Sequence, residues 1–141
     1  MRKATLGLLV VLCLWGATSW QRQQTLPQWR VVAERHMTNS TEFLFNVTVF
    51  TFQETGLYRL SGFCSAVTNY NQAGWEFFLT WRDISGNSVT ANVQCGADTN
   101  GPTSIVTVFD PQASSPVVLR NEFTGDGSAT YDAAITIEKL Q

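Results

Sequence analysis

Histidine is almost absent from this chain, since His36 is the only one in 141 residues. A Ser-His-Asp or Cys-His catalytic site needs a histidine as its general base, so such a site would have to use His36. No Gly-x-Ser-x-Gly sequence for a nucleophilic serine accompanies it. One histidine with so few cysteines cannot form a zinc site without several carboxylates. We therefore predict that the chain is not an enzyme and needs no metal or other cofactor.

The carboxylates give only a weak signal for chemistry. A glycosidase on a β-sandwich works with two carboxylates a few ångströms apart, and here the acidic residues are scattered along the chain. The segments Asp98–Gly101 and Asp126–Gly127 resemble the start of calcium loops, but they offer too few oxygen ligands for the roughly six to eight that calcium takes. Aspartate and asparagine favour turns in any case. A small extracellular hydrolase remains the third functional alternative.

Charged residues are also scarce, at 14% of the chain, and the formal net charge is −2. Beyond Arg2-Lys3 at the N-terminus, the basic residues occur singly and form no cluster. A protein that binds nucleic acid needs a basic face to neutralise phosphates. The sequence therefore disfavours a nucleic-acid partner.

The N-terminus has the pattern of a secretory signal peptide. A positive start, Arg2-Lys3, precedes an apolar run from Leu6 to Gly16 and the small residues Ala17 and Ser19. The run is shorter than the roughly 20 residues that span a bilayer. We predict a cleaved leader at residues 1–19, a polar lead-in at 20–28 and one domain at 29–141. The mature chain would have no membrane span and would be secreted, periplasmic or bound at the cell surface.

Removal of the leader would leave two cysteines, Cys64 and Cys95. An even number of cysteines in an exported chain favours a disulfide. Cys64 has the same strand parity as Leu60, and Cys95 has that of Val93, so both side chains should point inward. We predict a Cys64–Cys95 disulfide, and two buried free thiols are the alternative.

Hydrophobic residues alternate with a period of two along most of the domain, and no segment has an extended period of 3.6 residues. Clusters of Gly, Asn, Asp, Ser and Pro separate the alternating runs. We expect eight strands, at Trp29–Glu34, Glu42–Phe52, Tyr58–Val67, Trp75–Arg82, Ser88–Gln94, Thr103–Phe109, Val117–Glu122 and Ala129–Leu140. Regularly spaced strands without helices predict an all-β antiparallel β-sandwich or barrel.

Several short motifs make the jelly-roll form of sandwich the favoured one. The sequence Thr55-Gly56-Leu57-Tyr58, which follows Phe50-Thr51-Phe52, resembles the Gly-x-Tyr strand of complement-head and tumour-necrosis-factor-like jelly rolls. The segments Leu79–Asp83 and Tyr131–Leu140 are similar to small jelly-roll domains of phage structural and bacterial surface proteins. This resemblance implies a jelly-roll fold and a tendency to form trimers or larger assemblies, and it implies no reaction.

The expected function is therefore structural or adhesive, through self-association into a trimer or larger assembly. Leu44 and Phe78 are predicted on outward faces, where apolar residues can form a subunit interface. Phe43 and Phe45 alternate with Leu44 and are therefore predicted on the opposite, inner face. The alternative is a carbohydrate-binding module, because an aromatic ring flanked by amides can stack on a sugar and bind its hydroxyls. The residues that would bind the glycan are Asn69, Tyr70, Asn71 and Gln72.

Two Asn-x-Ser/Thr sequences are acceptor motifs for N-linked glycans. The first, Asn39-Ser40-Thr41, is expected in a loop. The second, Asn46-Val47-Thr48, is expected in the middle of a strand, which makes it the poorer acceptor.

Overall fold

The computed structural model describes residues 26–66, 74–96, 103–125 and 129–141. These residues form eight strands and no helix, which confirms the predicted all-β class. The strands are β1 (Trp29–Ser40), β2 (Val47–Thr51), β3 (Tyr58–Ala66), β4 (Gly74–Arg82), β5 (Ser88–Gly96), β6 (Thr103–Phe109), β7 (Pro116–Thr124) and β8 (Tyr131–Leu140). None of the described residues forms a helix that is long and apolar enough to cross a membrane.

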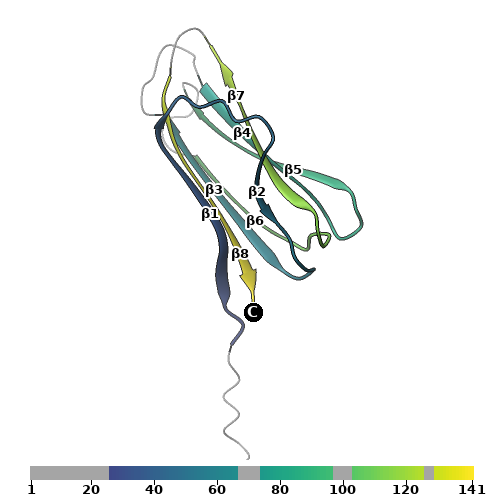
Figure 1. Ribbon diagram of the computed structural model, residues 1–141. Helices are drawn as coiled ribbons and strands as arrows, with labels where there is room; N and C mark the ends of the chain where they lie inside the picture. Colours follow the sequence, from purple (N-terminus) through teal and green to yellow (C-terminus); the bar gives the residue numbers. More distant parts are fainter. Residues whose placement is uncertain (1–25, 67–73, 97–102, 126–128) are drawn as a thin grey trace, which may run out of the picture.

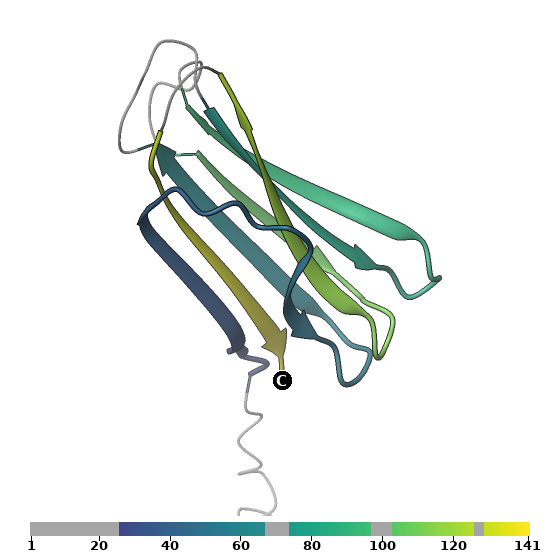
Figure 2. The same ribbon diagram turned by 45° about the horizontal axis from the view of Figure 1, so that its top comes forward.

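The strands form two four-stranded antiparallel sheets that pack face to face (Figures 1 and 2). Sheet A has the order β1-β8-β3-β6, and sheet B has the order β2-β7-β4-β5. Apart from β4 and β5, which follow each other in sequence, neighbouring strands of each sheet are far apart in sequence, as in two interleaved Greek keys, and this arrangement is the jelly roll. Edge strands β1 and β2 lie on one side of the sandwich, and edge strands β5 and β6 lie on the other.

The core is the layer between the two sheets, and it follows from the period-two alternation of the strands. In β4, for example, Trp75, Phe77, Leu79 and Trp81 are buried, while the residues between them face outward. Aromatic rings cluster towards both ends of this layer. Phe52, Tyr58 and Phe109 contact one another at one end, and Trp75 packs on Tyr131 at the other. Rings at 4.5–7 Å add to the stability that their buried area provides.

Two strand boundaries differ from the prediction by more than two residues. We expected a connection at Met37–Thr41, but β1 continues to Ser40, because the chain keeps pairing with β8 through a register shift after Met37. We also expected a strand at Glu42–Phe52, but β2 begins only at Val47. Residues 41–46 form a loop that crosses from sheet A to sheet B (Figure 2).

The predicted orientation within that loop was also wrong. Leu44 was expected to face outward, with Phe43 and Phe45 on the inner face. In the structure Leu44 is 1% exposed, whereas Phe43 is 66% and Phe45 is 90% exposed. The side chain of Leu44 therefore belongs to the core, and the two phenylalanines lie at the surface.

The predicted disulfide is present between Cys64 and Cys95. Cys64 lies on β3 of sheet A and Cys95 on β5 of sheet B, and both are fully buried. Their Cα atoms are 5.5 Å apart, within the usual range for a disulfide. The bond therefore joins the two sheets covalently across the core.

We expect the double variant Cys64→Ala/Cys95→Ala to lose about 3–4 kcal/mol of unfolding free energy, because the bond closes a 31-residue separation and restricts the unfolded chain. Urea denaturation of the variant and of the wild type measures this difference. Wild-type protein treated with a thiol reductant is the control and should show the same loss. An unchanged midpoint after reduction, with loss of the bond verified by intact mass, would contradict the prediction.

Candidate functional site

The outer face of sheet A carries an apolar strip at its β6 margin. We define this strip as Phe63 of β3 with Val106 and Val108 of β6. These residues alternate with inward ones such as Ile105, which packs against the core. Val106 is 64% exposed, and all three belong to the exposed large hydrophobic residues of the molecule. Across the β3–β6 ladder, Phe63 lies opposite Ser104 and Val106 opposite Ser61, whereas Val108 lies opposite Arg59.

A paired set of charges lies at one end of the same face. The Arg59 guanidinium donates a hydrogen bond of 2.6 Å from Nε to Oε2 of Glu138, and it lies 4.9 Å from the ring centre of Trp29. This hydrogen bond lowers the pKa of Glu138 and raises the pKa of Arg59. The two charges therefore compensate each other, and they add little net charge to the face.

The opposite margin of sheet A, along β1, has a different character. Glu34 and His36 lie on its outer face, with 3.7 Å between Oε2 and Nε2. Arg35 of the same strand forms an ion pair with Glu42 at 3.7 Å. The face thus carries Glu34 and His36 along β1, where Val31 is also exposed, and it carries the apolar strip along β6.

The outer face of sheet B is polar and has one aromatic ring near its middle. The Phe78 ring has the Arg120 guanidinium over it, 3.9 Å from the ring centre, and Arg120 also forms an ion pair with Glu122. On the next strand, Asn92 Nδ2 donates a hydrogen bond of 2.6 Å to Oε1 of Glu76. Carboxylate, amide, guanidinium and aromatic groups therefore share this face, and they can bind a ligand rich in hydroxyl groups.

Two shallow hollows adjoin the face of sheet B. One, of about 160 Å³, lies between the 41–46 loop and β7 and includes Phe45, Arg120 and Glu122 in its lining. The other, of about 310 Å³, lies between the edges of β5 and β6 and is lined by Asn92, Val93, Gln94, Thr103 and Ser104. The first is smaller than a typical small-molecule pocket, and the second has a volume at the lower limit for such pockets.

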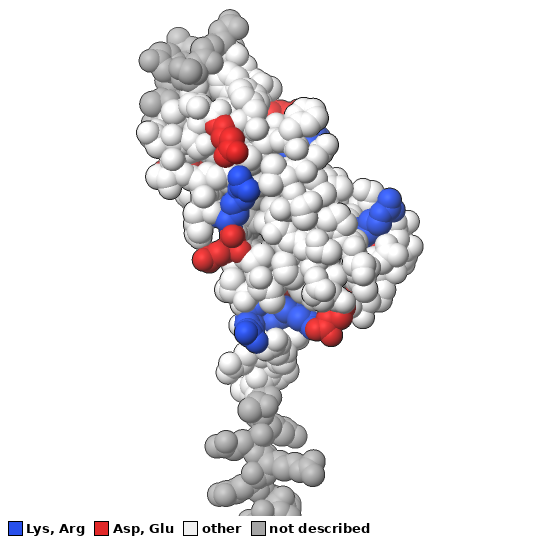
Figure 3. All heavy atoms as spheres, viewed as in Figure 1, with Lys and Arg blue, Asp and Glu red and all other residues white. Residues whose placement is uncertain are grey.

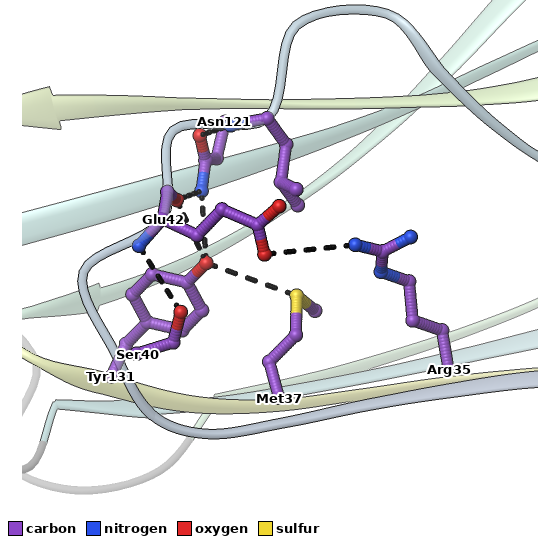
Figure 4. Close-up of polar contacts among 7 residues, drawn as sticks. Arg35, Met37, Ser40, Glu42, Asn121 and Tyr131 are labelled. Carbon is purple, nitrogen blue, oxygen red and sulfur yellow. Dashed lines mark hydrogen bonds and ion pairs between the residues drawn. The ribbon is translucent and has the colours of Figure 1, made fainter.

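A buried polar network holds the 41–46 loop in place (Figure 4). Asn121 is its centre: the Leu44 N–H donates to Oδ1 at 2.7 Å, and Nδ2 donates to the Glu42 carbonyl at 2.9 Å. The Tyr131 hydroxyl donates to the same carbonyl at 2.9 Å and lies 3.8 Å from Met37 Sδ. Burial raises the pKa of Tyr131. Backbone groups of the loop are thus paired inside the protein, as buried polar groups require.

The network has a consequence at the surface. By drawing Leu44 into the core, it turns the flanking Phe43 and Phe45 outward. Phe43 packs against Trp75, with 4.9 Å between ring centres, and Phe45 makes no ring contact within the described residues. Phe45 is thus an aromatic side chain at the surface, on a loop whose backbone is hydrogen-bonded to Asn121.

The predicted glycan-binding residues Asn69, Tyr70, Asn71 and Gln72 lie outside the described residues, as do the segments Asp98–Gly101 and Asp126–Gly127. Segment 67–73 connects Ala66 of β3 to Gly74 of β4. Phe78 faces outward as predicted. Among the described residues, no group of three or more His, Cys, Asp or Glu side chains is placed to hold a metal ion. On the face seen in Figure 3, charged side chains form small mixed groups on a largely uncharged surface.

The apolar strip was not found by sequence reasoning. The run Thr103–Phe109 was recognised as a strand, but its faces were not assigned. Strand alternation could have revealed the strip, because Val106 and Val108 have the opposite parity to Ile105, which packs against the core. No such signal existed for Phe43 and Phe45. Their outward orientation follows from the burial of Leu44, whose N–H is hydrogen-bonded to Asn121 of β7.

No family model matches the chain, and no curated protein matches its sequence. Solved structures of jelly-roll β-sandwich domains are similar to it. They include the CBM22-1 xylan-binding domain of Xyn10C from Paenibacillus barcinonensis (19% identity, 83% of each chain, TM-score 0.40). The PRD1 vertex protein P5 is 12% identical over 81% of this chain and 99% of that chain, with a TM-score of 0.49. The Eiger TNF from S. frugiperda is 15% identical over 79% of this chain and 94% of that chain, with a TM-score of 0.39. At such low identities and TM-scores, the fold assignment rests on the strand order.

We expect Asn121→Ala to destabilise the protein by about 1–3 kcal/mol, because the Leu44 N–H and the Glu42 carbonyl each lose a buried partner. Urea unfolding followed by tryptophan fluorescence measures the change. The matched control is Asn92→Ala, whose amide lies on the exposed face of β5 and should cost no more than about 0.5 kcal/mol. Equal effects of the two substitutions would rule out a structural role for the network.

Proposed function

We propose that the chain is a non-enzymatic extracellular module that self-associates through the apolar strip of Phe63, Val106 and Val108. The observation that supports this most directly is the exposure of three apolar side chains on the outer face of one sheet. Subunit interfaces have an apolar centre from which charge is depleted. The charges on the same face are paired with each other or lie along the opposite margin.

The composition of the edge strands also favours an interface on the β5–β6 side of the molecule. Natural proteins protect an exposed edge strand with charged residues, proline or short length. Edge strand β1 has Arg30, Glu34 and Arg35, and β2 has only five residues. Strands β5 and β6 have nine and seven residues with no charge and no proline. A second copy of the chain that packs along this side would cover both the strip and the edge of β6.

Export is part of the proposal, with cleavage of residues 1–19 before Trp20. A disulfide is typical of proteins that fold in an oxidising compartment, and the one here is buried between the two sheets, near the ends of β3 and β5. We further propose that residues 20–28 are a lead-in to the single domain at 29–141.

We expect the wild-type protein to form a trimer or larger assembly in light scattering, and Val106→Glu/Val108→Glu to weaken association at least about tenfold, because each new carboxylate would be buried without a partner. Thr90→Glu, an exposed position on the outer face of sheet B, is the matched control and should associate like the wild type. A monomeric wild type at high concentration would exclude this function.

Carbohydrate binding is the second candidate, and the outer face of sheet B favours it. This face combines the Phe78 ring with the side chains of Glu76, Asn92 and Gln94. Carboxylates and amides bind sugar hydroxyls, and an aromatic ring can pack on the apolar face of a sugar. We propose that Asn69, Tyr70, Asn71 and Gln72, which come shortly before β4 in the sequence, contribute to the same surface.

If the protein binds glycans, we expect Tyr70→Ala and Phe78→Ala each to lower the affinity about tenfold or more, because Tyr70→Ala removes a stacking ring and Phe78→Ala removes the ring on which the Arg120 guanidinium lies. A glycan array identifies a ligand, and gel shift with that polysaccharide measures the change. Phe63→Ala, on the outer face of sheet A, is the control and should leave binding unchanged. Binding that survives both substitutions would exclude this surface as the glycan site.

A further inference from the structure

The two acceptor motifs for N-linked glycans lie at the two ends of one surface loop. Asn39 is the penultimate residue of β1, and Asn46 directly precedes β2. Between them runs the 41–46 loop, which the Asn121 network holds in place. The second motif was expected in the middle of a strand, and the structure corrects this, because the strand begins one residue after Asn46.

Both asparagines have the local geometry that leaves a side chain free for modification. Each has a left-handed backbone, with φ of 47° at Asn39 and 52° at Asn46. Both are exposed. Neither side-chain amide takes part in a hydrogen bond within the described part of the chain. A sugar on either Nδ2 atom would therefore displace no existing contact of that amide.

The backbone around Asn39 is fixed without use of its side chain. The β1–β8 register shifts between Met37 and Ser40, so Asn39 lies outside the regular ladder. Its N–H donates instead to Oδ1 of Asp132 at 2.6 Å. The hydroxyl residues two positions after each asparagine, Thr41 and Thr48, are also exposed.

We propose that Asn46 and Asn39 carry N-linked oligosaccharides when the chain passes through a eukaryotic secretory pathway. This proposal rests on the proposed export of the chain. The co-reactant is an oligosaccharide attached to a lipid diphosphate. A bond forms between Nδ2 of the asparagine and C1 of the first sugar, the bond from C1 to the diphosphate oxygen breaks, and the amide loses one proton. The glycans would project from the β1–β2 side of the sandwich, away from β5 and β6.

The test is expression of the full chain in a eukaryotic secretory host, with medium and cell extract both analysed. Treatment with an amidase that releases N-glycans should lower the mass and convert Asn46 and Asn39 to aspartate, which peptide mapping locates. Asn46→Gln and Thr48→Ala should each remove one glycan, whereas Thr48→Ser should retain it. Asn87→Gln, at an exposed asparagine outside any acceptor motif, is the control and should leave the number of glycans unchanged.

The possible failures are distinguishable. Chain in the medium without glycans would overturn the glycosylation proposal and leave export standing. Chain that stays in the cell without glycans would overturn both. A glycan on Asn39 alone would overturn the assignment of Asn46, and the opposite result would overturn that of Asn39.

Discussion

Burial of one face of every strand between the two sheets is the constraint on which this molecule depends. The inner residues form one continuous layer, and the Cys64–Cys95 bond joins the sheets across it. A chain of this size has little other apolar area with which to offset its loss of conformational entropy. The inner positions are therefore committed to stability. Function is left to the outer faces, the edges and the loops.

The two outer faces are chemically distinct. Sheet A has apolar side chains along β6 and a self-compensating Arg59–Glu138 pair. Sheet B has Glu76, Asn92 and Arg120 around the Phe78 ring. Covering an apolar face with a second protein surface is favourable because it removes that face from water. A face of hydrogen-bonding groups instead favours a polar ligand. Self-association and glycan binding would thus occupy opposite faces and need not compete.

Most of the fold could be predicted from the sequence because it depends on local alternation. About eight strands were predicted and eight are found, and the even number of cysteines, supported by the parity of Cys64 and Cys95, led to their pairing. Alternation failed at residues 43–45, where three successive apolar residues are compatible with either phase. Which of the three side chains is buried depends on Asn121, which lies 77 positions further along the chain and accepts a hydrogen bond from the Leu44 N–H. No local pattern contains that information, and the same holds for the end of β1, where pairing with β8 extends the strand to Ser40.

The sandwich also has two chemically different sides, and this asymmetry connects the proposals. On the β1–β2 side lie the charged residues of β1, the 41–46 loop and both acceptor asparagines. On the β5–β6 side lie two uncharged edge strands and the apolar strip. A bulky hydrated oligosaccharide opposes close packing of protein on its own side and leaves the other side open. Glycans at Asn39 and Asn46 would therefore restrict association to the side where the apolar residues are exposed, so the orientation of subunits would be set by exclusion as well as by attraction. The hollow beside Phe45 and Arg120 is also lined by Asn46, so a glycan on Asn46 would cover it. A soluble ligand of sheet B would then bind more readily on the half formed by β4 and β5.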